Sequence, residues 1–253
     1  MFEHWTVDGV IIEFPGSATF SLGRDSVVLL RDDADDHDLV AHLLLDHVIP
    51  RLVSLRGDLM LHAAGVVGPS GKAHLFLGPS GTGKSTLVTA LAVAGWPLLD
   101  DDGIRIIRRD DSWNAVPGYA GVRLLPDSAE AVVPHLVAER PMAKGHPKHR
   151  YAVDGTALHM AESPVPIGSI LLVERADGDG PRSTPLRFSD GIAVLCEHAF
   201  HSADEPAELT RQAFDRAAAV AANVPLHRLR TPVGLNTMIS TMSEISRLDT
   251  ALA

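Results

Sequence analysis

The residues with the clearest chemical potential lie in the stretch FLGPSGTGKSTL, which begins at Phe76. Its glycines, lysine and serine match the Walker A spacing G-x-x-x-x-G-K-[ST], which is typical of loops that bind phosphate. Small residues let the backbone curl so that successive N–H groups face phosphate oxygens, and the helix that follows presents its positive end to the same charge. We therefore predict that Lys84 reaches the terminal phosphates and that the Ser85 hydroxyl binds Mg²⁺. The residues expected to hold the nucleotide are Gly78, Pro79, Ser80, Gly81, Thr82, Gly83, Lys84, Ser85 and Thr86.

Three consecutive carboxylates, Asp100, Asp101 and Asp102, follow an apolar strand pattern one helix length after this loop. One interpretation is that a single carboxylate holds the water shell of Mg²⁺ and that the others are solvated turn residues. The other interpretation assigns two functions, because neighbouring residues of a strand point to opposite faces and cannot be equivalent. One carboxylate would then serve the metal, and another would accept a proton from an attacking hydroxyl. The residues alone leave both interpretations open.

Composition and charge limit the classes of function. The chain has 253 residues, of which 45% are hydrophobic and 21% charged, so it can bury a full core. Its formal net charge of −10 disfavours nucleic acid and anionic membranes as partners. Cys196 is the single cysteine, which excludes an internal disulfide. The start of the chain lacks the pattern of a signal peptide, and no apolar stretch approaches the roughly 20 residues that span a bilayer, so we expect a cytoplasmic protein.

A strand before the loop and a helix after it must position these residues. The patterns predict a strand over residues 73–78 and a helix over residues 84–94. The chain then returns as a strand over residues 97–102, which carries the carboxylates. Residues 59–67 predict one further strand, which a glycine-rich turn joins to the strand that precedes the loop.

The rest of the chain fits the same α/β class. The helix over residues 38–55 is expected to break or kink at Pro50, and the helix over residues 127–137 is expected to begin at Asp127 or Ser128 as N-cap. No internal repeat or low-complexity linker interrupts the pattern, so we predict a single domain over residues 1–253, with a small β-rich N-terminal segment over about residues 1–35. The other predicted strands cover residues 7–14, 25–32, 103–109 and 167–174, and the other predicted helices lie near residues 190–201, 206–222 and 235–248.

The stretch from LHAAGV to PLLDDDGIRI resembles the catalytic domain of HPr kinase/phosphorylase and its shorter relatives, such as the peptide-serine kinases of lasso-peptide clusters. In that family a histidine lies on the strand before the loop strand, the loop helix ends at a glycine, and the next strand carries paired aspartates. His62, Gly95 and the pair Asp101–Asp102 occupy these positions. The match is specific over residues 61–106. The resemblance implies an α/β P-loop nucleotide-binding domain of HPr-kinase type, with a mixed central sheet and flanking helices.

The resemblance also implies roles for individual residues. Asp101 would be the general base that takes a proton from a serine hydroxyl, with Lys84 at the terminal phosphates and His62 in contact with Asp101 to orient it. Asp102 would hold Mg²⁺ together with Ser85. Taken alone, His62 is more simply interpreted as a satisfied core or strand-edge histidine, and the positional match to the family is what favours the functional role. The implied cofactors are ATP and Mg²⁺, the implied partner is a peptide, protein or small-molecule hydroxyl acceptor, and the hexamers common among the related kinases allow a homo-oligomer.

Several cationic or acidic residues have both a functional and a structural interpretation. Arg123, Lys148 and Arg150 could face phosphates or a substrate carboxylate, or they could form surface ion pairs and a solvated loop. Asp127 could add a Mg²⁺ contact or cap a helix. The basic stretch that contains Lys148 and Arg150 also holds Lys144, His146 and His149.

Two further groups are weaker candidates. Cys196 and His198 are two residues apart and do not share a helix face, which argues against a zinc site with His201. Trp96, Trp113 and Tyr119 could stack an adenine ring, although packing is the simpler role for each of them.

Two classes of function follow. In the first, the protein is a kinase that transfers the γ-phosphate of ATP to a hydroxyl, most simply that of a serine. In the second, it is a nucleotide-dependent ATPase or switch that transfers phosphate to no acceptor. The paired aspartates and His62 favour the kinase, and a carboxykinase-like reaction on the same kind of loop is a third, more distant interpretation. A P-loop binds only the phosphates of a nucleotide, so the sequence does not identify the base.

Overall fold

The computed structural model describes residues 1–138, 140–143, 146–153, 158–178, 180–202, 204–232 and 234–252. Its first element is a four-stranded antiparallel sheet in the order β1-β2-β3-β4. Alternate residues of β2 and β3 are buried, and they form a core of their own with the helical segment that follows. These strands are β1 (Phe2–Thr6), β2 (Gly9–Phe14), β3 (Ala18–Leu22) and β4 (Val27–Asp32).

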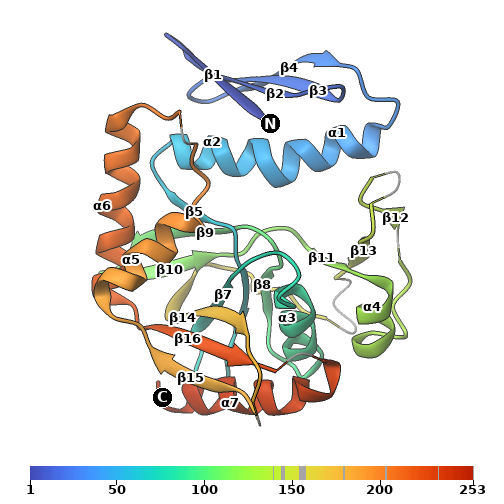
Figure 1. Cartoon of the computed structure of the whole chain (residues 1–253), viewed down its shortest axis with the longest axis vertical. Helices are drawn as coiled ribbons and strands as arrows, with labels where there is room; N and C mark the ends of the chain where they lie inside the picture. Colours follow the sequence, from blue (N-terminus) through green and yellow to red (C-terminus); the bar gives the residue numbers. More distant parts are fainter. Residues whose placement is uncertain are drawn as a thin grey trace.

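That helical segment is continuous but irregular. It runs as α1 (His37–Leu43), a π-helical turn η1 (Leu44–Val48) and α2 (Ile49–Leu55). Pro50 has no N–H to donate, and the wider π turn lies directly before it, where the N–H of Ile49 donates to the carbonyl of Leu44. The predicted break at Pro50 is therefore a π turn rather than an end of the helix. In Figure 1 the segment lies between the four-stranded sheet and the rest of the molecule.

The described residues form a central sheet of nine strands, which is mixed as predicted. Its strand β14 lies parallel to β7 and β16, and the remaining pairs are antiparallel. The main path runs β5 (Leu59–Leu61), β9 (Ile104–Arg109), β10 (Ser112–Val116), β14 (Val165–Arg175), β7 (Ala73–Leu77), β6 (Ala64–Val67) and β8 (Leu98–Asp100), while β16 (Leu226–Thr231) pairs with β14 and with β15 (Arg182–Pro185). A small sheet beside it has the order β11 (Gly121–Leu124), β13 (His149–Ala152) and β12 (Arg140–Pro141).

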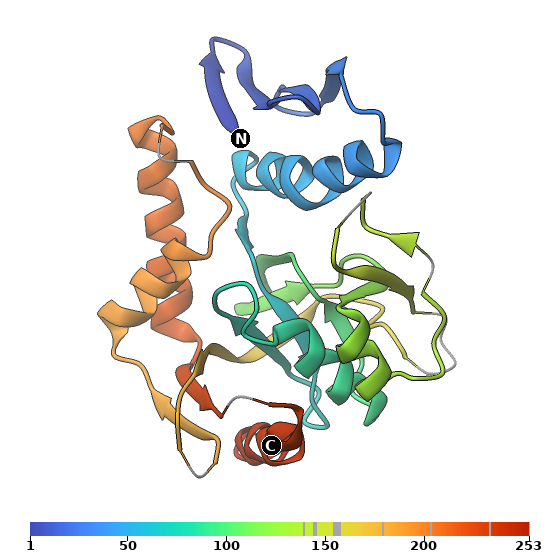
Figure 2. The same ribbon diagram turned by 45° about the vertical axis from the view of Figure 1, so that its right-hand side comes forward.

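Helices cover both faces of the central sheet, which confirms the expected α/β class. Leu75 and Leu77 of β7 face one core with α5 and α6, whereas Phe76 faces a second core with α3, α4 and α7. Figures 1 and 2 show α5 and α6 on one side of the sheet and α3 and α4 on the other. The helices are α3 (Lys84–Val93), α4 (Pro126–Val132), α5 (Phe188–Glu197), α6 (Ala207–Asn223), the 3-10 turn η2 (Leu235–Thr237) and α7 (Met238–Thr250). None of the helices described is long and apolar enough to cross a membrane.

Two predictions about these elements are wrong. The expected strand over residues 59–67 is two strands, because the N–H of His62 donates to the carbonyl of His198 and the N–H of Ala63 donates to that of Asp102. These bonds divert the chain from β5, which pairs with β9, to β6, which pairs with β7. In addition, α4 begins after Leu125 with Pro126 in its first turn, so neither Asp127 nor Ser128 is its N-cap.

Candidate functional site

A cavity of about 960 Å³ lies where the glycine-rich loop, the carboxylate strand and η1 meet. It brings the predicted loop residues other than Thr82 together with Asp101, Asp102 and His62. The Thr82 hydroxyl donates instead to the carbonyl of Pro79 at 2.9 Å. Side chains from the N-terminal helical segment and from the stretch after α5 complete its wall. The predicted residues that line it are His62, Gly78, Pro79, Ser80, Gly81, Gly83, Lys84, Ser85, Thr86, Asp101, Asp102, Arg123, His146 and Lys148.

The glycine-rich loop turns sharply between β7 and α3. Gly78 has φ +140° and Gly83 has φ +90°, conformations that side chains with a Cβ rarely adopt. A Cβ on Gly78 would lie 2.6 Å from the carbonyl oxygen of Val173, and one on Gly83 would lie 2.5 Å from the Arg175 guanidinium. Within the described part of the chain, no side chain caps the first turn of α3. The loop and the helix start therefore offer the donors that an anion requires.

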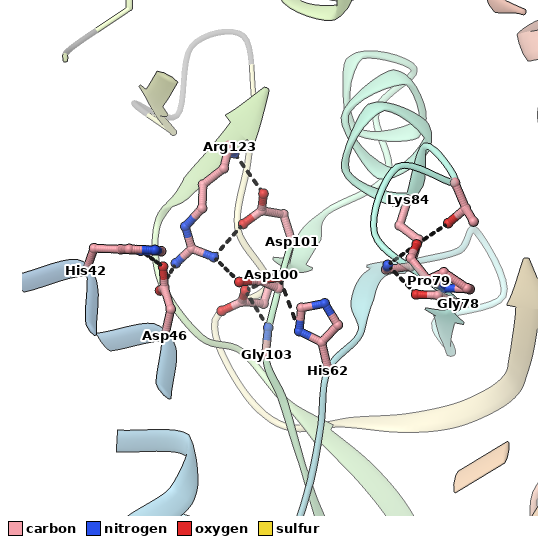
Figure 3. Close-up of polar contacts among 12 residues, drawn as sticks. His42, Asp46, His62, Gly78, Pro79, Lys84, Asp100, Asp101, Gly103 and Arg123 are labelled. Carbon is pink, nitrogen blue, oxygen red and sulfur yellow. Dashed lines mark hydrogen bonds and ion pairs between the residues drawn. The ribbon is translucent and has the colours of Figure 1, made fainter. Parts of the chain in front are cut away.

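Lys84 is buried and folds back onto this loop. Its ammonium group donates to the carbonyl oxygens of Gly78 at 2.6 Å and Pro79 at 3.2 Å, and Figure 3 shows it pointing at both. Burial lowers the pKa of Lys84, while the negative charge of Asp102 opposes that shift. The ammonium group thus lies inside the turn of the loop, in the same cavity as the carboxylates of Asp101 and Asp102.

Asp100 has a structural role. Its carboxylate accepts hydrogen bonds from the backbone N–H groups of Asp102, Gly103 and Tyr119, at 2.8, 3.2 and 2.9 Å. Burial raises its pKa. The interpretation of spare solvated turn residues is therefore wrong for Asp100, which fixes the turn that follows β8.

Asp101 is 2% exposed and is held by Arg123. The backbone N–H of Arg123 donates to one carboxylate oxygen at 2.7 Å, and its guanidinium lies 3.3 Å from the other. Burial raises the pKa of Asp101 to about 7. The positive charge of Arg123 opposes this rise, and the negative charges of Asp100 and Asp102 add to it. Asp101 is thus not a solvated turn residue either.

The same guanidinium also binds two further carboxylates. It lies 3.2 Å from Asp102 and donates to Asp46 of η1 at 2.6 Å. Burial alone would raise the pKa of Asp46, but the hydrogen bond from His42 and the charge of Arg123 lower it. Figure 3 shows the resulting arrangement, with His42 and Asp46 on one side of Arg123 and with His62 and Lys84 on the other.

His62 pairs with Asp102, whereas the resemblance implied a contact with Asp101. Its Nδ1 lies 3.3 Å from the Asp102 carboxylate, and its ring lies edge-on to Phe200 with ring centroids 6.1 Å apart. Burial lowers the pKa of His62, and the charge of Asp102 opposes the shift. The histidine therefore acts on the partly exposed carboxylate, which is the one predicted to serve the metal.

The residues present fit a magnesium nucleotide. The uncapped start of α3, the glycine turns and Lys84 suit a polyphosphate, and Ser85 and Asp102 offer in the same cavity the oxygen ligands that Mg²⁺ prefers. Within the described parts of the chain, His, Cys, Asp and Glu side chains form no ready-made cluster of three or more for a metal. A Mg²⁺ ion at this site would therefore take its remaining ligands from phosphate and water.

The other predicted residues are distributed unevenly. Lys148 lines the cavity, while Arg150 is buried behind it beside Tyr119. The Nε and Nη2 atoms of Arg150 have no hydrogen-bond partner among the described residues. Asp127 is exposed in the first turn of α4, outside the cavity lining, and Lys144 lies outside the described residues.

The candidate metal and stacking residues make contacts within the chain, and His198 and His201 also line the cavity. The His198 ring bonds to the carbonyl of Val194 and the His201 ring to that of Ala199, each at 2.9 Å. Trp96 packs against His74, with ring centroids 5.7 Å apart. Trp113 lies beneath Arg108.

Residues that the sequence did not single out also line the cavity, among them Arg175, His42, Asp46 and His47. Arg175, at the end of β14, lies against Gly83 and is held by Pro232 and Thr231. His42, Asp46 and His47 come from α1 and η1. Their spacing is that of an ordinary amphipathic helix, and only the π turn and the ion pair with Arg123 distinguish them, so no local sequence pattern could have found them.

Comparisons with known proteins add one distant similarity. No family model matches the chain, and no curated protein matches its sequence. Among solved structures, the chain is similar to the Hpr(Ser) kinase/phosphatase from Coxiella burnetii, with 13% sequence identity and a TM-score of 0.42. The alignment covers 76% of this chain and 98% of that chain. At this identity and TM-score the similarity shows neither family membership nor activity, so the function must be argued from the cavity itself.

Proposed function

We propose that the protein is a Mg²⁺-dependent kinase that transfers the γ-phosphate of ATP to a hydroxyl group, most simply that of a serine in a peptide, a protein or a small molecule. The observation that carries this proposal is one cavity that contains the glycine-rich loop, Lys84 and the carboxylates of Asp101 and Asp102. Phosphoryl transfer needs little covalent help from the protein, and positioning with charge neutralisation does most of the work.

Each residue has a distinct part in this reaction. The loop backbone and the start of α3 bind the phosphates, while Lys84 leaves the carbonyl of Gly78 to neutralise the transferred group. Asp101 accepts the proton of the acceptor hydroxyl as its oxygen attacks phosphorus and the bond to the leaving ADP breaks. Asp102 and Ser85 would hold Mg²⁺, which when bound would neutralise charge on the phosphate oxygens. His62 and Arg123 orient the carboxylates.

One observation favours the second class, an ATPase or switch. Both oxygens of Asp101 interact with Arg123, and the Asp101 side chain is almost fully buried. An acceptor therefore reaches Asp101 only if Arg123 moves away or if the carboxylate binds Arg123 and the acceptor together. A switch would keep the contact closed and release phosphate only to water.

Phosphate transfer from labelled ATP separates the two classes. The acceptors are free serine and peptides that contain or end in serine, and the variants are the wild type and Asp101→Asn, with nucleotide binding measured for both. A kinase predicts labelled acceptor with the wild type and loss of labelling on the order of 10²–10⁴-fold in Asp101→Asn, with binding retained. Nucleotide binding or slow hydrolysis without any labelled acceptor, unchanged in the variant, would instead support the switch.

A further inference from the structure

The parallel strands of the central sheet end beside the glycine-rich loop. β14 lies between β7 and β16 and is parallel to both (Figure 1). The pairing of β14 with β7 ends where Leu172 meets Leu77, and β14 then continues to Arg175 while β7 turns into the loop. Arg175 therefore lies at the carboxyl ends of parallel strands, where open α/β sheets bind their ligands.

Two sets of contacts fix the Arg175 side chain at this edge. Its Nη1 atom donates to the carbonyl of Pro232 at 2.8 Å and to the hydroxyl of Thr231 at 3.2 Å, at the end of β16. Its Nη2 atom lies so close to the loop that a Cβ on Gly83 would be 2.5 Å from it. Within the described part of the chain the hydrogen bonds of Arg175 all use Nη1, so the N–H groups of Nε and Nη2 are left for a ligand in the cavity.

The positive charge of Arg175 has no counter-charge among the described side chains. Both groups that hold its Nη1 atom are neutral, and no described carboxylate forms an ion pair with it. The neighbouring carboxylate of Glu174 points to the opposite face of the sheet, where it pairs with Arg228 and Arg230. In a chain with a net charge of −10, an unbalanced guanidinium beside a glycine-rich loop suits a phosphate, which accepts from two of its N–H groups at once.

We propose that Arg175 is a phosphate-binding residue of the nucleotide site, which donates through Nε and Nη2 to the phosphate chain of ATP. This inference rests on the nucleotide binding of the proposed function but not on phosphate transfer. Lys84 meets the phosphates from inside the turn of the loop, and Arg175 meets them from the end of β14. Gly83 permits this approach, because any side chain there would displace the guanidinium. The phosphate in contact is either the terminal one or an inner one.

Nucleotide affinity of the full chain tests this contact separately from phosphate transfer. ATP and ADP displace a fluorescent ADP analogue in the presence of Mg²⁺, for the wild type, Arg175→Ala and Arg230→Ala. Arg230 is the matched control, because it is an exposed arginine of the neighbouring strand β16, pairs with Glu174 and lies outside the cavity lining. Each titration is repeated with millimolar guanidinium chloride, and phosphate transfer from labelled ATP is measured on the wild type.

Arg175→Ala should bind ATP on the order of 10–100-fold more weakly, the size expected when a hydrogen bond between charged groups is lost. Added guanidinium should restore part of this affinity, because the free cation can occupy the vacated position. Arg230→Ala should match the wild type with and without guanidinium. A loss for ATP alone places the contact at the terminal phosphate, whereas a loss for ATP and ADP places it at an inner phosphate.

Unchanged affinity in Arg175→Ala, or an equal loss in Arg230→Ala, would overturn the contact. A loss that guanidinium does not restore would also overturn it, since Arg175 would then act only through the shape of the loop. A wild type that binds neither nucleotide would overturn both the contact and the kinase. A loss restored by guanidinium, together with no phosphate transfer to any acceptor, would leave the contact standing and contradict the kinase.

Discussion

At the scale of single residues, the site depends on one guanidinium shared among carboxylates from different elements. Arg123 of β11 contacts Asp101 and Asp102 after β8, and Asp46 of η1. Burial lowers the pKa of this arginine, but the surrounding carboxylates, Asp101 first among them, raise it overall, so it stays charged. The planar fork of arginine can meet several carboxylates at fixed angles, which the point charge of a lysine cannot do. The geometry of the proposed base therefore depends on the shape of Arg123 as well as on its charge.

The first prediction concerns Arg123→Lys. The lysine keeps the positive charge and the backbone N–H that binds one oxygen of Asp101, but it cannot contact Asp46 and both catalytic-site aspartates together, so the second oxygen of Asp101 should lose its fixed partner. We expect kcat for phosphate transfer to fall on the order of 10²-fold, because small misplacements of a reacting group have effects of that size. The affinity for MgATP should change by less than about threefold, since the glycine-rich loop is untouched. Steady-state kinetics together with a nucleotide titration measure both quantities.

A matched variant separates position from charge. Arg123→Gln leaves Asp46 and Asp101 buried without a full counter-charge, and removal of one partner from a buried ion pair costs about 3–5 kcal/mol of folding free energy. The lysine variant should be clearly more stable than the glutamine variant in urea unfolding. A folded Arg123→Lys protein with wild-type kcat would contradict the positioning role.

At the scale of elements, a buried polar cluster ties α7 to the strand that precedes the glycine-rich loop. His74 of β7 bonds to Asp249 of α7 through Nε2 and to Ser169 of β14 through Nδ1, both at 2.9 Å. Asp249 also bonds to the hydroxyl and to the backbone N–H of Ser70 in the turn before β7. These contacts fasten the last helix to the turn and to the strand that leads into the glycine-rich loop.

The second prediction is that this cluster makes folding stability fall with acidification. Burial lowers the pKa of His74, so below about pH 6.5 the unfolded chain takes up a proton that the folded chain does not. Burial alone would raise the pKa of Asp249, but the hydrogen bonds from His74 and Ser70 lower it, so its contribution is lost as the pH falls below about 4. Stability should therefore decline from about pH 6.5 downward, and His74 should contribute a slope of up to about 1.4 kcal/mol per pH unit.

Urea unfolding between pH 7.5 and pH 5 on the wild type and His74→Gln checks this slope. The groups that face His74 are Asp249, Ser169 and Trp96, of which Asp249 alone can change charge, and it stays ionised in this range. His74→Gln should be less dependent on pH than the wild type, while the exposed control His37→Gln should match the wild type. Equal slopes for His74→Gln and the wild type would show that the cluster does not titrate on unfolding.

At the scale of the whole molecule, local patterns predicted the core elements around the loop, and long-range contacts decided the rest. The strand, loop and helix from β7 to α3 follow the predicted ranges, because strand alternation, glycine turns and helical spacing are properties of short stretches. The split between β5 and β6 was not predicted, since it depends on hydrogen bonds from His62 and Ala63 to residues far along the chain. The role of Asp46 in the site was not predicted for the same reason, because its ion pair with Arg123 depends on the packing of the N-terminal helical segment against β11.

The third prediction concerns the ion pairs that attach the N-terminal unit, residues 2–55, to the rest of the molecule. Arg51 of α2 is 3% exposed. Its guanidinium donates to both carboxylate oxygens of Glu3, at 2.9 and 3.2 Å, and to one carboxylate oxygen of Glu205 at 3.1 Å. It also donates to the carbonyl of Phe200, which lines the cavity. Since Glu3 lies on β1 and Glu205 lies just before α6, this one side chain joins three distant segments.

Arg51→Met should lower the free energy of unfolding by about 3–5 kcal/mol, because it leaves two carboxylates buried without their partner. If Arg51 holds the N-terminal unit in place, the variant should also increase hydrogen exchange over residues 2–55 more than over the central sheet. Adding Glu3→Gln and Glu205→Gln to Arg51→Met should recover part of the lost stability, since neutral amides are less costly to bury. Arg108→Met, at an exposed ion pair, should change stability by less than about 1 kcal/mol. A uniform increase in exchange across the chain would instead mean that the N-terminal unit and the central sheet unfold as one cooperative structure, and that Arg51 stabilises the whole molecule rather than one wall of the cavity.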